Sequence, residues 1–255
     1  MAHDQITKGV GIIPDFFHDI LAYIIPGYML LLNLTINYNL VANNSPMFIS
    51  DIEIWALTFL LIPAYVLGRF CEHVGKMFFD SKYLGKYSSK PKWDLIFKGD
   101  YYTESFKNNL KVKIKAWLKN QDGEQLMKEC EESDNQKDEY FNLIQFYLRE
   151  RFPSIALYEK KQNATIVLVR SLSIIFGANT MLYALQVGYF LCESSDSITV
   201  DYLGILWILS NLVLGYVFYK RYRLDRKYHA MYIFESFLAT KRLLISKADD
   251  EKQTN

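Results

Sequence analysis

A few polar side chains lie deep inside long apolar runs of this 255-residue chain. Arg170 lies about six residues into one run. A charged side chain at that depth must form an ion pair, line a water-filled pore or extend back to the lipid headgroups. Asn179 and Asn211 lie near the middle of two neighbouring runs, where an amide needs a partner. These three residues are candidates for lining a pore or a gate, and interhelical hydrogen bonding and snorkelling are the alternatives.

A charged group marks the inner end of another apolar run. Arg69 precedes the dipeptide Glu72-His73 by three residues. A Glu-His pair invites a metal hypothesis, but adjacent side chains point about 100° apart on a helix, and no HExxH pattern is present. We interpret the group as an ion pair at the membrane boundary, with no metal and no cofactor. Arg69 and Arg170 are also candidates for a ring of positive charge at a cytoplasmic vestibule.

Enzyme signatures are absent from the sequence. It contains no GxSxG, GxxxxGK[ST] or GxGxxG pattern, and no pair of carboxylates within one apolar run. A membrane enzyme without a recognisable motif is the alternative, and we expect a protein that is not an enzyme. The net charge is only +1, and the abundant aromatic residues suit membrane interfaces, so binding to double-stranded nucleic acid is not expected.

The apolar runs have the length of transmembrane helices. A span needs about 20 apolar residues, with about 17 as the lower limit. Pro26-Gly27 lies in the inner half of the first run and predicts a kink there. We expect four spans at about 20–36, 54–70, 164–191 and 202–219.

The charges of the connecting segments predict the orientation. Residues 39–54 and 193–201 carry acidic side chains and no lysine or arginine, although the chain has 29 of these basic residues. Cytoplasmic loops are enriched in lysine and arginine, so the two acidic segments are expected outside. We therefore expect a multi-pass protein of the inner (plasma) membrane with both termini in the cytoplasm.

The remaining segments predict a cytoplasmic helical part. Residues 82–163 form an insertion between two hairpins, 1–81 and 164–219, and residues 220–255 continue the last span as a helix. An apolar arc along this helix needs a partner, which is either the insertion or the same helix of another subunit. The interaction candidates on the helix are Arg226, His229, Ile233 and Phe237.

Three local patterns together carry a family resemblance. They are Ile-Ile-Pro-Gly-Tyr at 24–28, Arg-Phe-Pro-Ser at 151–154, and Arg-Tyr-Arg at 221–223 with Phe-Glu-Ser-Phe-Leu at 234–238. The combination resembles small bacterial four-span membrane proteins of antiphage defence systems, such as the Hailong-type channel effector and the Kiwa-type membrane subunit. The resemblance implies a homo-oligomer, for example a tetramer, whose cytoplasmic part responds to a protein or a small nucleotide-type ligand.

The sequence thus predicts an all-α polytopic membrane protein with a cytoplasmic helical insertion and a C-terminal cytoplasmic helix. The first functional hypothesis is a gated ion channel that depolarises the membrane and is held shut by the cytoplasmic helices. The alternative is a non-conducting sensor or scaffold that recruits a cytoplasmic protein to the bilayer.

Overall fold

The structure, a computed structural model, describes residues 16, 18–41, 58–80, 92–119, 134–193 and 202–253. These residues are almost entirely helical and contain no strand, which confirms the all-α fold class. The elements in order are a π-helical turn η1 (Ile20–Ile24) and the α-helices α2 (Ile25–Val41), α4 (Leu61–Asp80), α5 (Lys92–Phe97), α6 (Glu104–Lys119), α8 (Asp134–Arg151), α9 (Pro153–Glu193) and α10 (Tyr202–Gln253).

The chain divides into two compact units. The first unit combines residues 1–84 with 163–223, and the second combines 85–162 with 224–255. The helices α9 and α10 contribute residues to both units.

Two of the described helices are long and apolar enough to cross a bilayer. These helices cover Ile20–Tyr38 and Pro153–Gly188, and they are compatible with a membrane protein. The second expected span overlaps α4, which begins at Leu61 and runs ten residues past the predicted inner end to Asp80. Residues 54–57 of that expected span lie outside the described part of the chain.

The chain changes its helical geometry where the sequence predicts a kink. The turn η1 (Ile20–Ile24) is π-helical, and α2 begins at Ile25, directly before Pro26. A π-turn widens the helix locally and is a recognised cause of bending. This change of geometry lies directly before the Pro-Gly pair at which the sequence predicts a kink.

Helix α4 approaches η1 and α2 until their backbones touch. A Cβ on Gly27 would overlap the carbonyl of Ala64, and a Cβ on Gly68 would overlap the carbonyl of Tyr23. Small residues on both helices permit this approach, as they do in packed membrane helices. The pairing of position 23 with 68 and of 27 with 64 shows that the two helices cross with opposite chain directions.

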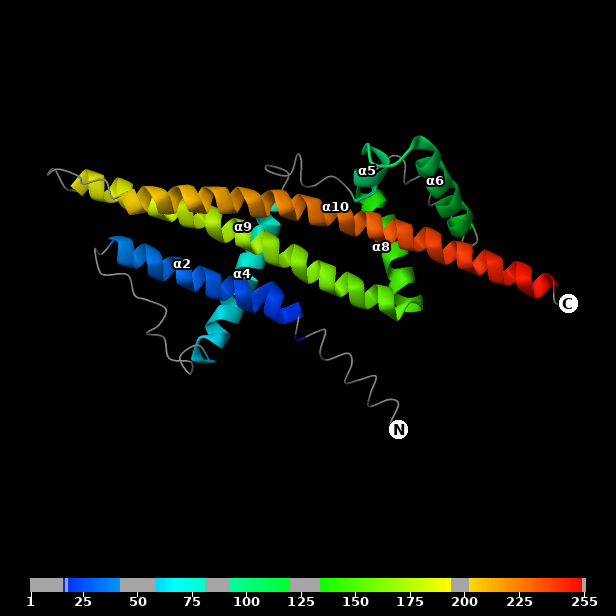
Figure 1. Cartoon of the computed structure of the whole chain (residues 1–255), viewed down its shortest axis with the longest axis horizontal. Coiled ribbons are helices and arrows are strands. Elements are labelled where there is room, and N and C mark those ends of the chain that lie inside the picture. Colours follow the sequence, from blue (N-terminus) through cyan, green and yellow to red (C-terminus); the bar gives the residue numbers. More distant parts are fainter. Residues whose placement is uncertain are drawn as a thin grey trace. The chain divides into compact units, whose positions relative to one another are not determined.

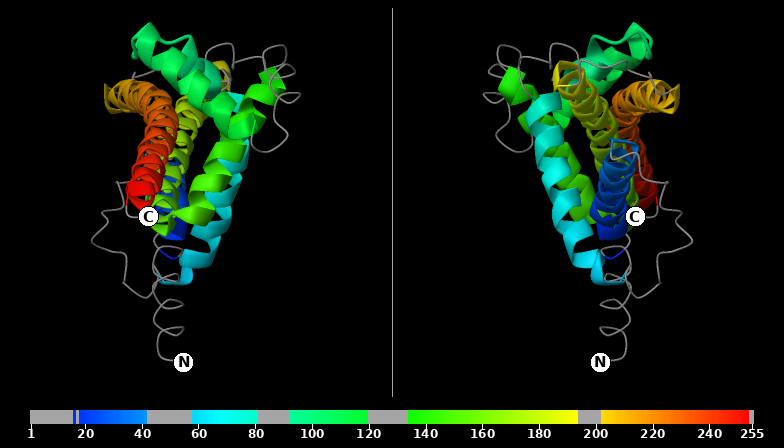
Figure 2. Two further views of the ribbon diagram at one scale, coloured as in Figure 1. Left: turned by 90° about the vertical axis from the view of Figure 1, so that its right-hand side faces the viewer. Right: turned by 90° about the vertical axis from the view of Figure 1, so that its left-hand side faces the viewer.

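Helix α4 crosses the other helices of the first unit at a steep angle (Figure 1, Figure 2). Its first turns pack on α2 through Ala64 and Gly68. Its middle meets Arg170 of α9 through Glu72, and its end stacks Phe79 on Tyr219 of α10. Within this unit α2, α9 and α10 run alongside one another, so α4 lies across all three.

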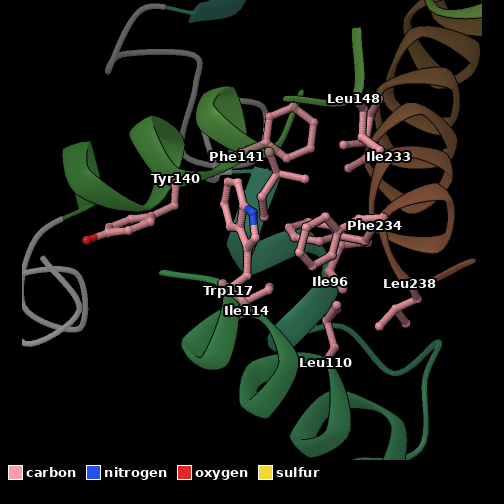
Figure 3. Close-up of a cluster of buried hydrophobic side chains, with 13 residues drawn as sticks. Ile96, Leu110, Ile114, Trp117, Tyr140, Phe141, Leu148, Ile233, Phe234 and Leu238 are labelled. Atoms are coloured by element: carbon pink, nitrogen blue, oxygen red, sulfur yellow. The ribbon is translucent and has the colours of Figure 1, made fainter. Parts of the chain in front are cut away.

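The second unit is built around a core rich in aromatic side chains. Helices α5, α6, α8 and α10 each contribute large apolar residues that converge on one cluster (Figure 3). Phe234 of α10 makes edge-to-face contacts with Trp93 and Phe141, an arrangement that aromatic rings favour. The fully buried members include Leu110, Ile114, Phe141, Ile144, Leu148, Ile233, Phe234 and Phe237.

This core supplies the partner for the apolar arc of the C-terminal helix. His229, Ile233 and Phe237 are 2 %, 0 % and 0 % exposed, and α5, α6 and α8 cover this face of α10. The sequence allowed two partners for this face, the insertion of the same chain or the same helix of a second subunit. In the structure the insertion covers it. Arg226 is only partly buried.

Candidate functional site

Four asparagines meet in the interior of the first unit. Asn33 and Asn37 lie one turn apart on the same face of α2, Asn179 lies on α9 and Asn211 on α10. Their side chains are 3 %, 2 %, 3 % and 1 % exposed, respectively. Three apolar helices thus each place amides at the same internal point.

The four amides form a closed hydrogen-bond network. Asn179 Nδ2 donates to Asn33 Oδ1 at 3.0 Å and to Asn211 Oδ1 at 2.9 Å. Asn37 Nδ2 donates to Asn179 Oδ1 at 2.5 Å, and Trp207 Nε1 donates to Asn37 Oδ1 at 2.8 Å. Asn33 Nδ2 and Asn211 Nδ2 donate to the backbone carbonyls of Met29 and Trp207. Each of the eight amide nitrogen and oxygen atoms in the network has a partner.

This network joins helices, and every amide nitrogen and oxygen in it has at least one partner within the chain. Asn179 alone connects α9 to α2 and to α10. An unpaired amide in an apolar surrounding costs about 1–3 kcal/mol, so the complete pairing favours this one arrangement of the three helices. We name these residues the asparagine cluster: Asn33, Asn37, Asn179, Asn211 and Trp207.

The outward surface around this cluster is apolar. Thr35, which is exposed, donates its hydroxyl to the backbone carbonyl of Leu31 and so offers no free donor. The exposed side chains of α9 and α10 near it include Met181, Leu185, Leu206, Leu209, Leu212, Val213 and Val217.

A charged cluster lies elsewhere in the first unit. Glu72 of α4 forms ion pairs with Lys76 at 2.7 Å, with Arg69 at 3.5 Å and with Arg170 of α9 at 3.5 Å. Arg69 also donates to the hydroxyl of Tyr23 at 2.9 Å and stacks on its ring. Three cations therefore surround one carboxylate.

The buried arginine of α9 is paired. The Arg170 side chain is 7 % exposed, and it lies against Gly75, where a Cβ would come within 3.1 Å of its Cγ. Of the sequence-based alternatives for Arg170, the structure shows an ion pair, with Glu72, rather than a side chain extended to the surface. The ion pair expected between Arg69 and Glu72 is present at 3.5 Å.

The second unit contains its own buried charge. Glu159 of α9 is completely buried, and its carboxylate accepts hydrogen bonds from Gln145 and from both Nε and Nη2 of Arg149. The Nε2 atom of His229 lies 3.7 Å from Glu159 Oε1, which is longer than a hydrogen bond. We name Glu159, Arg149, Gln145 and His229 the glutamate cluster.

Burial and neighbouring groups set the protonation of the glutamate cluster. Burial alone would raise the pKa of Glu159, but the nearby His229 and the hydrogen bonds from Arg149 and Gln145 outweigh it and lower the pKa to about 2. Burial lowers the pKa of His229, and Glu159 only partly opposes this effect. At neutral pH the cluster therefore holds an ionised carboxylate beside a neutral imidazole.

The structure brings some of the predicted site residues together and separates others. Asn179 and Asn211 meet in the asparagine cluster, while Arg69 and Arg170 share Glu72. Arg170 and Asn179 are nine residues, or about 14 Å, apart along α9, so the two clusters lie at different levels.

Several residues of these clusters were not among the predicted site residues. Asn33 and Asn37 repeat the pattern of isolated amides in an apolar run, and this spacing of four residues could have identified them. Trp207 and Glu159 carry no such signal, because their roles depend on contacts between distant segments.

The described residues contain no group of three or more His, Cys, Asp or Glu side chains that could hold a metal ion. The two buried carboxylates described above, Glu72 and Glu159, instead form ion pairs with lysine or arginine side chains. Comparison of this chain with protein-family models, with curated proteins and with solved structures finds no match in any of the three.

Proposed function

We propose that this protein is a non-conducting membrane scaffold or sensor whose helical second unit lies in the cytoplasm and recruits a protein partner. In this proposal the chain crosses the inner membrane four times, with both termini inside. The two apolar helices and the acidic, base-free segments 39–54 and 193–201 support this arrangement.

The observation that carries the proposal is the closure of the asparagine cluster within one chain. A conduit needs polar side chains that face water, and each amide of the cluster is already paired inside the protein. The described side chains of α10 that face outward from its span are mainly leucine and valine. Both features favour helix packing over the gated channel that was the first hypothesis.

The second unit offers the surface for recruitment. Leu143 and Phe146 lie three residues apart on α8 and are 42 % and 59 % exposed, in contrast to the buried opposite face of that helix. Since α9 and α10 contribute to both units, a partner bound there would act on helices that also enter the bilayer.

Two measurements on the full-length protein test this proposal. A photo-crosslinking residue at Phe146 should yield one defined protein adduct in cells, whereas the same residue at Leu212, facing lipid, should yield none. Vesicles containing the purified protein should show no ion flux with or without that adduct partner.

The asparagines provide the decisive comparison. Asn179→Leu should leave crosslinking at position 146 within about twofold of the unaltered chain once expression is matched. If vesicles with the unaltered chain showed an ion flux and Asn179→Leu abolished it, the scaffold proposal would be wrong and the channel hypothesis would be favoured.

A further inference from the structure

The charged cluster of the first unit holds more positive than negative charge. Arg69, Lys76 and Arg170 all form ion pairs with Glu72, so one carboxylate serves three cations. Arg170 alone balances the charge of Glu72, and Arg69 and Lys76 therefore give the cluster a surplus of positive charge. In the described part of the chain these two side chains pair with no other carboxylate. The surplus charge favours the binding of an anion.

The two surplus cations are exposed. The side chains of Arg69 and Lys76 are 53 % and 55 % exposed, whereas that of Arg170 is 7 % exposed. The hydrogen bond of Arg69 to Tyr23 and its ion pair with Glu72 both use Nη1, and Lys76 contacts Glu72 through an ammonium that has three donors. Both side chains thus keep N–H donors that no described residue occupies. Phosphate oxygens bind such donors on charged groups.

His73 lies between these two cations on the same face of α4. Arg69, His73 and Lys76 are spaced four and three residues apart, and all three are exposed. The first and the third are about 10 Å apart along the helix axis. The ion pairs with Glu72 fix the positions of both cations. We name Arg69, His73 and Lys76 the basic trio.

The exposed face of α4 changes its chemistry at the basic trio. Ile62, Val66 and Phe70 are 73 %, 59 % and 61 % exposed, and their spacing of four residues makes them a continuous apolar stripe about 12 Å long. We name these three residues the apolar stripe. Phe70 lies three residues before His73, so the stripe leads into the basic trio along one side of the helix. A ligand that contacts both must have a long apolar part and an anionic end.

The four crossings of the proposed function place this change of chemistry at the inner boundary of the membrane. The second span is predicted to end at about residue 70, so the apolar stripe lies within the bilayer and the basic trio at its cytoplasmic edge. Arg69 contacts Tyr23, which lies close to the predicted inner start of the first span at about residue 20. Lipid phosphates lie at this boundary, and the cytoplasmic leaflet carries the anionic lipids.

We propose that α4 binds one anionic phospholipid of the inner leaflet, with its phosphate at the basic trio and an acyl chain along the apolar stripe. This inference rests on the membrane location proposed above and deepens it by naming the class of lipid. A zwitterionic headgroup carries its own cation, which the surplus charge of the cluster repels. An anionic headgroup has no such cation, so the site prefers it.

Lipid titration of the purified full-length protein tests the inference. The protein in a neutral detergent is titrated with dioleoyl phosphatidylglycerol, and native mass spectrometry counts the bound lipids. Dioleoyl phosphatidylcholine has the same chains with a zwitterionic headgroup, and glycerol 3-phosphate has the phosphate without the chains. Phosphatidylglycerol should bind at one molecule per chain and at least about tenfold more tightly than either of the other compounds.

Charge variants locate the site. Arg69→Gln with Lys76→Gln should weaken phosphatidylglycerol binding about 10- to 30-fold, because both cations near the phosphate are lost. Lys220→Gln with Arg223→Gln is the matched control, because it removes one exposed lysine and one exposed arginine after the last predicted span. This control should change binding by less than about threefold. The exchange Arg69→Lys with Lys76→Arg preserves the charge and should also stay within about threefold, which separates a loss of charge from a loss of folding.

The outcomes distinguish the lipid site from the membrane location. Equal binding of phosphatidylglycerol and phosphatidylcholine, or equal losses in the glutamine pair and its control, would overturn the lipid site and leave the membrane location intact. Glycerol 3-phosphate that binds as tightly as phosphatidylglycerol would assign the basic trio to a free phosphate compound and also overturn the lipid site. A protein that stays in solution without detergent and binds neither lipid would overturn the membrane location and, with it, the site.

Discussion

The two units bury polar clusters of opposite character. The asparagine cluster of the first unit is uncharged, and its amides satisfy one another across three helices. The glutamate cluster of the second unit buries an ionised carboxylate, which depends on Arg149 for its counter-charge. A neutral network can remain in an apolar environment at little cost, while a buried charge becomes very unfavourable when its partner is lost. The comparison predicts that the asparagine cluster tolerates single changes better than the glutamate cluster does.

The largest effect should come from Arg149→Met. This change leaves the buried carboxylate of Glu159 without its cation. Removing one member of a buried pair costs about 3–5 kcal/mol, and the low end of that range is expected here because the Arg149 side chain is 47 % exposed. Trp93 and Trp117 lie in the second unit, so their fluorescence during denaturation of the purified protein reports its free energy of unfolding. Arg151→Met is the matched control, because Arg151 is exposed like Arg149 but lies over the Tyr147 ring and not beside a buried carboxylate, and it should change stability by less than about 0.5 kcal/mol.

The double variant Arg149→Met with Glu159→Gln sharpens this test. Removing the charge together with its partner should restore a substantial part of the lost stability, because no buried ion remains unpaired. Equal losses in the single and the double variant would show that Arg149 acts by packing and not by charge.

A smaller effect is expected from Asn179→Leu in the first unit. The change removes three hydrogen bonds at roughly 0.6 kcal/mol each, for a loss of about 2 kcal/mol. Thr180→Val is the control on the next residue, because the Thr180 hydroxyl donates to the Phe176 carbonyl one turn away within α9 and so joins no second helix through that bond. Thermal stability of the detergent-solubilised protein measures both. If Thr180→Val were as damaging as Asn179→Leu, the network would have no special role.

The two clusters should also differ in their response to acid. The pKa values of His229 and Glu159 are both lower in the folded state, so the unfolded chain takes up protons first and stability falls as the pH falls. The loss begins below about pH 6.5 for His229, where Lys92 and Arg149 add nearby positive charge, and continues from about 4.5 to 2 for Glu159. Each proton contributes at most about 1.4 kcal/mol per pH unit.

Denaturation of the second unit at pH 7.5, 6 and 5 measures this slope, and His229→Gln should remove the part between 6.5 and 5. The asparagine cluster contains no titratable group, so the cost of Asn179→Leu should be the same at each pH. A stability of the second unit that does not change between pH 7.5 and 5 would contradict the neutral, buried state of His229.

The sequence predicted the helices better than the contacts between them. Hydropathy identified the long helix around 164–191, and the lack of proline and glycine identified the helix around 221–245, because these signals are local. The pairing of Arg170 with Glu72 joins residues 98 positions apart, and local spacing contains no information about it. The steep crossing of α4 escaped prediction for a related reason. Hydropathy measures how apolar a segment is and not the direction in which it lies.

The backbone contact between Gly27 and Ala64, and between Tyr23 and Gly68, has a consequence for assembly. Only this alignment places a glycine opposite each carbonyl, so sliding either helix by one turn would force larger side chains into the same gap. The crossing therefore admits a single register, and a side chain at either glycine would push the two helices apart.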